Sequence, residues 1–363
     1  MKLRVFNEIR LHRDNLLGNL RYVQELTSKK VIPVLKSNAY GHGIAQVAEI
    51  LDNRVDLVAV DSVYEASTVS QSFGGEVLIM EYFKPENLRF LRKRQWILTV
   101  KSVQDIRALG RKRRKIHLEI NTGMNRMGAS LNEVSDILDE IKLHKNLTLD
   151  GVFTHLADAD NALDDNYTKM QIEKFDACVA EILEAGFAPR YIHVAATAGS
   201  VKAKSQFANA ERLGIGLYGI NPLSENDAEF AELAQLKPVL EMTSEIVNVL
   251  EIKKGEKVSY NGIFTASHAM KIGVLPVGYF EGLPRELSNK GCVIYGSRKL
   301  PILGRVCMNH AMIDISGTDL GIGDEVKVFD LGNNSIEKVC REFGLFSYGV
   351  AVYINNSIRR TIV

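Results

Sequence analysis

The chain of 363 residues is long enough for one large domain and a smaller second one. Its 45 Lys and Arg residues against 44 Asp and Glu leave a formal charge of +1, which argues against nucleic acid or an anionic membrane surface as a partner. No stretch approaches the roughly 18 apolar residues of a membrane span, and the charged N-terminal segment does not resemble a signal peptide.

The four cysteines lie far apart and form no Cys-x-x-Cys pair. This pattern is typical of reduced thiols rather than of a disulfide framework. We therefore expect a cytoplasmic protein, and we expect no bound metal.

Short apolar runs recur through the first two-thirds of the chain and predict eight strands. They lie at 31–36, 55–60, 76–81, 96–100, 115–120, 149–154, 191–195 and 213–219. Helical patterns lie between them at 44–52, 62–71, 85–93, 102–110, 131–143, 166–185 and 197–204, and one more helix near 12–28 precedes the first strand. Eight strands alternating with helices favour a (β/α)8 TIM barrel, and a doubly wound open sheet is the alternative.

The pattern changes after about residue 232. Segments at 243–252, 256–260, 270–279, 292–295, 301–306, 312–315 and 325–330 are β-like, and a late helix is predicted near 336–343. The predicted fold class is therefore α/β, with a barrel over residues 1–232 followed by an all-β domain over residues 233–363.

Lys36 follows the first predicted strand and precedes a Gly-His-Gly turn at 41–43. Burial at a strand end disfavours the charged ammonium and favours the neutral amine, the form that attacks a carbonyl carbon. A lysine that simply extends from the strand into solvent is the alternative, and it is the commoner one for an isolated strand–lysine–loop pattern.

Polar residues collect at the predicted carboxyl ends of the strands, where a barrel places its active site. In the fifth strand His117, Glu119 and Asn121 alternate with aliphatic residues, so we expect the polar face to point into the barrel. Other polar residues at strand ends or starts are Tyr40, Arg126, His155, Thr197 and Arg212.

Seven segments in this order resemble the alanine racemase family, which belongs to the fold-type III enzymes that use pyridoxal 5'-phosphate (PLP). They are residues 34–43, 121–128, 151–155, 211–219, 258–260, 276–279 and 304–308, and the resemblance covers essentially the whole chain. It implies that PLP is bound covalently to the amine of Lys36.

The resemblance also implies two bases, one for each face of a planar carbanion. Lys36 would act on one face and Tyr260, from the β domain, on the other, with Arg212 and His155 forming a relay that supports the tyrosine. An ordinary aromatic residue of a strand is the alternative for Tyr260.

Further roles follow from the same resemblance. Arg212 would donate to the pyridine nitrogen and keep it unprotonated, because arginine stays charged in proteins. Arg126 would bind the substrate carboxylate. Phosphate ligands would be the backbone at Gly214 and Ile215 and the hydroxyl groups of Tyr40, Thr197 and Tyr348, while the backbone near Met308 would assist Arg126 and Tyr279 would support the site.

Some positions depart from the family pattern. Glu119 stands where many members carry a carbamylated lysine, and we expect its carboxylate to hold Arg126 directly. Pairing of Glu119 with His117 or another cation is the alternative. Asn121, Ala196 and Asn309 also differ, and they leave the preferred amino acid open.

The leading hypothesis is a racemase that interconverts L- and D-alanine, supplies D-alanine for peptidoglycan, and works as a homodimer with shared active sites. A serine-preferring or broad-specificity racemase is the nearest alternative. A PLP decarboxylase would require an acid in place of Arg212, and a non-catalytic barrel-only PLP-binding protein would lack residues 233–363.

Overall fold

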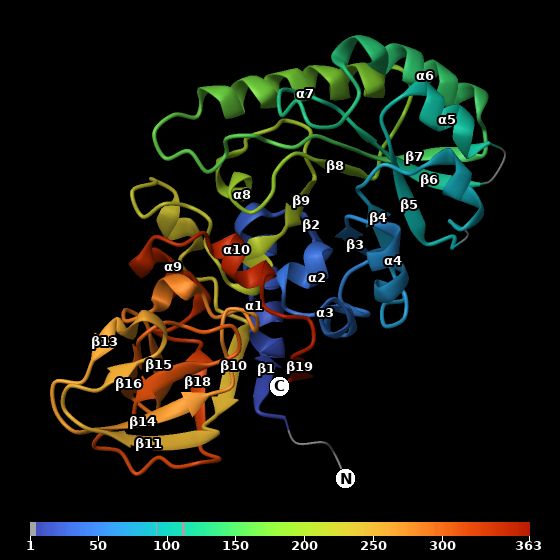
Figure 1. The fold of residues 1–363 in the computed structure, drawn as a ribbon. Coiled ribbons are helices and arrows are strands. Elements are labelled where there is room, and N and C mark those ends of the chain that lie inside the picture. Colours follow the sequence, from blue (N-terminus) through green and yellow to red (C-terminus); the bar gives the residue numbers. More distant parts are fainter. Residues whose placement is uncertain (1–4, 92, 111–112) are drawn as a thin grey trace.

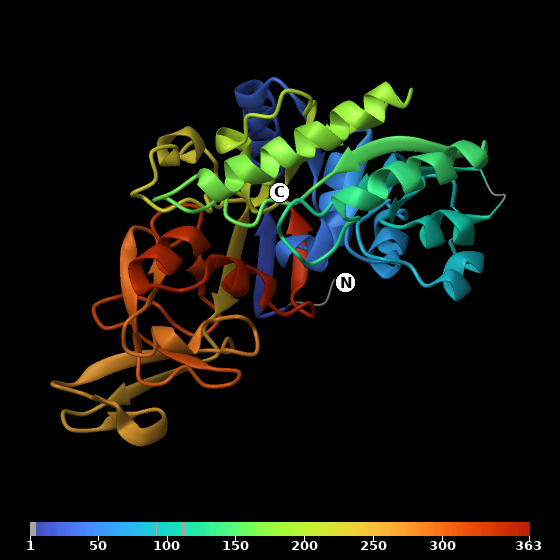
Figure 2. The ribbon, with the colours of Figure 1, turned by 90° about the horizontal axis from the view of Figure 1, so that it is seen from above.

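The computed structural model describes residues 5–91, 93–110 and 113–363. Two bodies lie side by side, one built on an eight-stranded parallel sheet and the other on a nine-stranded sheet (Figure 1). The view from above shows the long helix α7 lying across the outer side of the first body (Figure 2). This arrangement confirms the predicted barrel followed by a β-rich domain.

The first body is a nearly closed barrel. Its strand order is β2-β9-β8-β7-β6-β5-β4-β3, and every pairing is parallel. The two outer strands meet beyond the end of β2, where Val34 bridges Ala59 and the Leu35 amide donates to the Ala59 carbonyl at 2.8 Å. The strands are β2 (Lys30–Pro33), β3 (Leu57–Val60), β4 (Glu76–Ile79), β5 (Trp96–Val100), β6 (Arg114–Glu119), β7 (Leu147–Phe153), β8 (Tyr191–His193) and β9 (Ala210–Leu213).

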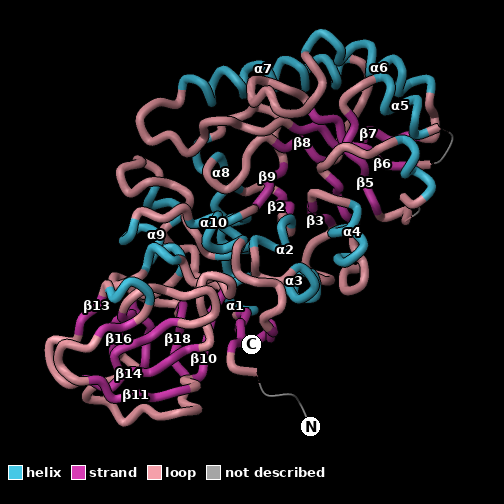
Figure 3. The backbone as a smooth tube through the Cα atoms, in the orientation of Figure 1, coloured by secondary structure: helices cyan, strands magenta, loops and turns pink. Residues whose placement is uncertain are grey.

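Helices cover the outside of the barrel (Figure 3). In α1 the buried residues Leu16, Leu20 and Val23 recur at the spacing of one helical face. Ser62 and Ser102 cap the first turns of α4 and α5, which marks where each helix leaves its strand. The helices are α1 (Arg13–Thr27), α3 (Ile44–Leu51), α4 (Val63–Val69), α5 (Val103–Leu109), α6 (Val134–Leu143), α7 (Asn166–Glu184) and α8 (Gly199–Lys202).

Some predicted elements of the barrel are wrong in detail. The eighth strand was expected at 213–219, but β9 ends at Leu213 and a 3₁₀ helix, η3 (Ile215–Tyr218), follows. A short buried apolar run cannot be assigned to strand or helix from periodicity alone. The helix expected at 85–93 is a 3₁₀ helix, η1 (Pro85–Arg89), and residue 92 lies outside the described residues.

The second body contains one strand from the start of the chain. Strand β1 (Asn7–Leu11) pairs with β10 and with β19, so the N-terminal segment belongs to the nine-stranded sheet rather than to the barrel. The predicted division at residue 232 stays a prediction. The other strands of that sheet are β10 (Leu240–Glu245), β11 (Asn248–Ile252), β14 (Met270–Leu275), β15 (Cys292–Tyr295), β16 (Arg298–Leu303), β17 (Ala311–Asp314), β18 (Glu325–Phe329) and β19 (Arg359–Ile362).

Smaller elements complete the second body. Strands β12 (Lys257–Val258) and β13 (Phe264–Thr265) form a two-stranded ladder. Helices α9 (Ile336–Phe343) and α10 (Ser347–Val352) follow β18, and α9 matches the predicted late helix. In the described part of the chain, no helix is both long and apolar enough to cross a membrane.

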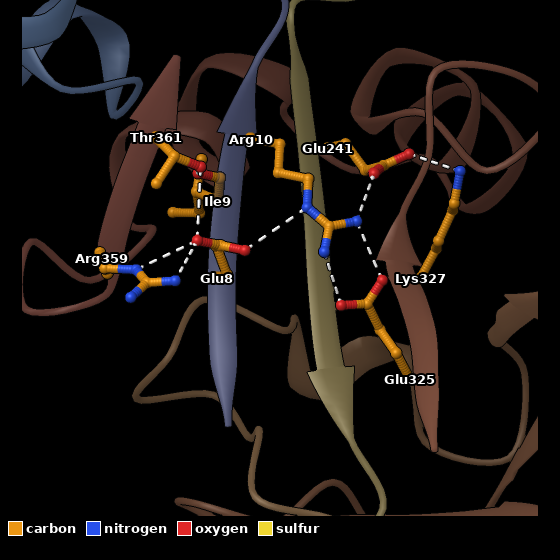
Figure 4. A network of polar contacts seen from close by, with 8 residues as sticks. All are labelled: Glu8, Ile9, Arg10, Glu241, Glu325, Lys327, Arg359 and Thr361. Carbon is orange, nitrogen blue, oxygen red and sulfur yellow. Dashed lines mark hydrogen bonds and ion pairs between the residues drawn. The ribbon is translucent and has the colours of Figure 1, made fainter. Parts of the chain in front are cut away.

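Charged side chains connect neighbouring strands across the face of the nine-stranded sheet (Figure 4). Arg10 on β1 contacts Glu325 on β18 at 2.7 Å, Glu241 on β10 at 3.3 Å and Glu8 on its own strand at 3.4 Å. Glu8 in turn accepts from Arg359 on β19 at 2.5 Å. Burial raises the pKa of Glu8, but the two arginines outweigh it and the net shift is downward.

We expect Arg10→Met to lower the free energy of unfolding by about 1–2 kcal/mol, because three carboxylates lose a shared, partly buried cation. Urea denaturation at fixed salt measures the change. Lys142→Met is the matched control, since the Lys142–Asp139 pair is exposed and should be worth less than about 0.5 kcal/mol. Equal losses in the two variants would contradict the role assigned to Arg10.

Candidate active site

The backbone after Lys36 forms a left-handed turn. Ser37, Asn38, Ala39 and Tyr40 have φ values of 54°, 54°, 54° and 51°. Each non-glycine residue in this conformation costs roughly 1–2 kcal/mol. The strand expected to run to Lys36 therefore ends earlier, at Pro33, and Lys36 opens the element α2 (Lys36–Tyr40).

Side chains from both bodies hold this turn. The Ser37 amide donates to Glu65 Oε1 at 2.6 Å, and the Ile44 amide donates to Asn38 Oδ1 at 2.9 Å. Arg360 of β19 donates to the Gly41 carbonyl at 2.8 Å. Strained backbone persists only where its surroundings over-determine it, and such positions concentrate at functional sites.

A cavity of about 870 Å³ opens beside this turn, at the carboxyl ends of the barrel strands. Most of the barrel residues singled out from the sequence line it together. They are Lys36, Tyr40, Glu119, Arg126, His155, Arg212 and Gly214, joined by Tyr348 from α10.

Lys36 is less buried than its position after an apolar run suggests. Its side chain is 34% exposed, and its Nζ lies 4.0 Å from Asp61 Oδ1. Asp61 follows β3 and lines the same cavity, but the sequence analysis did not single it out. In the sequence, the only feature that marked Asp61 as a possible site residue was its place directly after a predicted strand.

Arg212 near the end of β9 is a buried cation. Its Nη1 donates to His193 Nδ1 at 2.7 Å, and its Nη2 donates to the carbonyls of Thr154 and Val194 at 2.7 and 2.9 Å. Burial lowers the pKa of Arg212 to about 10, so it is still protonated at neutral pH. Among the described residues none accepts from its Nε, which leaves one donor for a ligand in the cavity.

His155 contacts the same guanidinium. Its Nδ1 lies 3.3 Å from Arg212 Nη2, and because arginine only donates, this nitrogen is the acceptor. Burial, with help from Arg212 and Arg126, lowers the pKa of His155 to about 3. The ring is therefore neutral, with its proton on Nε2, which agrees with the expected arginine–histidine contact.

Two of the residues expected around the phosphate, Gly214 and Ile215, lie at the start of η3. A Cβ atom at Gly214 would lie 2.7 Å from Tyr40 Oη, so glycine leaves room for the hydroxyl here. Burial raises the pKa of Tyr40 to about 12 and also raises that of Tyr348, which keeps both as donors. Thr197 is buried and accepts from the Gly216 amide at 3.1 Å, and Ile215 is also buried; neither side chain lines the cavity.

The direct bond expected between Glu119 and Arg126 is absent from the described contacts. Both residues line the cavity, but no ion pair joins them, and Glu119 does not pair with His117 either. Burial raises the pKa of Glu119 although Arg212 and Arg126 oppose the shift. Glu119 is thus 7% exposed and lies near two cations, with no bond to either among the described contacts.

Except for Tyr348, the residues expected from the β domain line a different cavity. Tyr260, Tyr279 and Met308 face a groove shared with α10, and they are 68%, 43% and 55% exposed. None of them lines the cavity that contains Lys36. Within one chain, therefore, the two expected bases do not meet.

One departure from the family pattern, Asn309, contacts Glu281. The Asn309 amide donates to Glu281 Oε1 at 2.8 Å, and Glu281 Oε2 accepts from the Gly278 amide at 2.8 Å. Asn121 is turned into its own loop, where it accepts from the amides of Gly123 and Asn125 at 3.1 and 3.0 Å. Asn121 therefore shapes the loop that carries Arg126 rather than the cavity wall.

We expect Asn38→Ala to lower the free energy of unfolding by about 1–2 kcal/mol, because it removes the acceptor for the Ile44 amide from a left-handed residue. Ser28→Ala is the matched control, since Ser28 has nearly the same φ of 55° at the end of α1. Thermal unfolding of both variants separates the loss of the Asn38 acceptor from the cost of placing alanine at a left-handed position. A loss no larger than that of Ser28→Ala would show that the Asn38 amide contributes nothing.

Comparison with known proteins matches both bodies. The alanine racemase N-terminal domain family matches residues 11–222, and the alanine racemase C-terminal domain family matches residues 239–362. The alanine racemase of Methanococcus maripaludis is 33% identical, with 90% of this chain and 89% of that protein covered.

Solved structures agree. The alanine racemase of Clostridium difficile 630 is 27% identical and superposes with a TM-score of 0.90, covering 100% of this chain and 97% of that one. The alanine racemase of Bartonella henselae with covalently bound pyridoxal phosphate is 20% identical with a TM-score of 0.83, covering 99% and 100%, and shows the shared fold. The cavity, the order of the motifs and these matches lead to one conclusion: the chain belongs to the alanine racemase family, whose members depend on PLP.

Proposed function

We propose that this chain is a PLP-dependent racemase that interconverts L- and D-alanine, with Lys36 as the residue that binds the cofactor. The observation that carries the proposal is the gathering of Lys36, Arg212, Tyr40 and Tyr348 around one cavity. When bound, PLP supplies an electron sink for the carbanion that forms at the substrate Cα. The protein supplies positioning and proton transfer.

Arg212 is the residue suited to the pyridine nitrogen. Its other donors are held by His193, His155 and backbone carbonyls, so among the contacts of the described residues only Nε is left for the cavity. A guanidinium cannot accept a proton, and a ring nitrogen that faces it therefore stays unprotonated. An arginine at this place also disfavours the decarboxylase alternative, which needs an acid here.

The phosphate would lie against the backbone of Gly214 and Ile215 at the start of η3, within reach of Tyr40. Backbone amides at such a turn bind anions well when no side chain intervenes. Thr197 supports this turn through the Gly216 amide rather than by facing the cavity. Arg126, exposed at the cavity mouth, is left for the carboxylate of the amino acid.

Racemisation needs a proton on either face of the substrate Cα. The Lys36 amine would serve one face and the Tyr260 hydroxyl the other. Tyr260 and Met308 lie exposed in the groove of the β domain, away from the cavity of their own chain. We therefore infer a head-to-tail homodimer in which each β domain completes the site of the other chain.

The alternatives fit less well. The curated relatives are named alanine racemases, which favours alanine over serine as the substrate. The match of residues 239–362 to a racemase C-terminal domain disfavours a barrel-only PLP-binding protein. Supply of D-alanine to peptidoglycan and a place in the cytoplasm stay predictions.

We expect Lys36→Ala to abolish alanine racemisation and the visible absorbance of bound cofactor. Borohydride should fix the cofactor to Lys36 in the native protein, and peptide mass spectrometry would locate it. Lys101→Ala is the matched control, because Lys101 lines the same cavity and should still allow that modification. Cofactor fixed to another lysine would overturn the assignment.

A mixing experiment tests the shared site. Lys36→Ala and Tyr260→Phe chains are each expected to be inactive, but each heterodimer holds one intact pair of bases. Refolding the two together should restore up to about a quarter of native activity, from half the dimers with one site each. No recovery, with heterodimers verified by mass, would refute a site built from two chains.

A further inference from the structure

A line of polar contacts runs from Arg212 through the barrel interior. His193 Nδ1 lies 2.7 Å from Arg212 Nη1, and the opposite nitrogen of His193, Nε2, lies 3.1 Å from His117 Nδ1. His117 Nε2 then lies 3.7 Å from Asp150 Oδ2. Both rings are fully buried, at 0% exposure. The proposed reaction assigns no role to this line beyond Arg212.

The far end of the line is the amino-terminal end of the barrel, away from the cavity. Arg190 contacts Asp150 Oδ2 at 2.9 Å, Lys115 lies 3.8 Å from Oδ1, and both cations also contact Glu76. Burial raises the pKa of Asp150, but His117 and Arg190 outweigh it and bring the value to about 2. A carboxylate charged at neutral pH therefore faces His117.

Donor and acceptor chemistry gives the line one direction. Arginine can only donate, so His193 Nδ1 accepts, and a neutral His193 must carry its proton on Nε2. That proton is donated to His117 Nδ1, which places the proton of a neutral His117 on Nε2, facing the carboxylate of Asp150. Burial lowers the pKa of both histidines, which keeps them neutral.

The last contact is longer than a hydrogen bond. His117 Nε2 is buried and has no hydrogen-bond partner among the described residues, so Asp150 acts on it through charge. Other groups that act on this ring are His193 beside it, the Tyr191 ring at 5.9 Å, and two charges behind the carboxylate, Arg190 and the more distant Glu76. Within the described ranges, only Asp150 presents an acceptor atom to Nε2.

The backbone of β7 makes room for this arrangement. The register between β6 and β7 shifts after Ile116, which leaves Asp150 as an extra residue between Leu149 and Gly151. Such a bulge redirects a side chain. A Cβ atom at Gly151 would lie 2.5 Å from the His117 ring, so glycine is needed where the ring packs on the strand.

We propose that Asp150 is a positioning residue for Arg212, acting across the barrel through His117 and His193. Its carboxylate holds both rings as Nε2–H tautomers and so keeps an acceptor on His193 for the guanidinium. With the other tautomer, a His193 N–H would face the guanidinium and displace it toward the cavity. The catalytic consequence rests on the proposed function, whereas the tautomers do not.

The test combines tautomer and rate measurements on cofactor-loaded protein labelled with ¹⁵N-histidine. Nitrogen–proton correlation spectra at neutral pH should show His117 and His193 as neutral Nε2–H rings. Asp150→Asn should give His117 a mixture of tautomers, because an amide can turn either way. It should lower kcat roughly tenfold, as removal of outer partners does elsewhere, with KM within about twofold.

Glu76→Gln is the matched control, since Glu76 shares Lys115 and Arg190 with Asp150 but does not contact His117. It should leave tautomers and kcat unchanged. His117→Phe keeps a ring in place and should reproduce the loss of kcat. It provides the test if Asp150→Asn does not fold.

The proposal is overturned if either native ring is charged or protonated on Nδ1, if Asp150→Asn keeps native tautomers and rate, or if Glu76→Gln matches Asp150→Asn. A native protein that does not racemise alanine but shows the expected tautomers would refute the proposed function. It would leave the assigned direction of the line from Asp150 to Arg212 intact.

Discussion

The site depends on a buried arginine, Arg212, that stays protonated at neutral pH. Arg212 is 3% exposed, and no described carboxylate lies within ion-pair distance of it. Carbonyls of three residues and the lone pairs of two neutral histidines balance it instead. A buried charge is tolerated only when it is well bonded. These acceptors come from β7, β8 and the segments just beyond them, so the ends of neighbouring strands must stay in register for the guanidinium to be held.

The second constraint is the left-handed turn that carries Lys36. Four consecutive non-glycine residues adopt a conformation that is unfavourable by itself. Glu65 on α4, and Arg360 on β19 of the other sheet, bond to this turn. Strands β1 and β19 pair with each other, so segments near both ends of the chain belong to the nine-stranded sheet that carries Arg360 (Figure 1). The two bodies thus contribute to one site even before a second chain is considered.

Much of this arrangement was predictable from the sequence, because strand–helix alternation and polar residues at strand ends are local signals. Lys36, Arg126, His155 and Arg212 were placed at one barrel mouth in this way, and the structure brings them to one cavity. Other features depend on tertiary contacts. The turn at Ser37–Tyr40 has no local signal, because its strain is offset by residues distant in sequence. The missing Glu119–Arg126 bond shows that a strand residue and a loop residue at the same barrel mouth need not be in contact.

The proposed reaction exchanges the proton at the α-carbon of alanine on both faces. The most direct measurement is proton NMR and chiral analysis of L-alanine incubated in heavy water with the PLP-loaded protein. Exchange on both faces predicts D-alanine that carries deuterium at Cα, and the same equilibrium mixture when D-alanine is the starting material. Release of carbon dioxide with formation of ethylamine, or retention of the L configuration in a protein that carries PLP on Lys36, would contradict it.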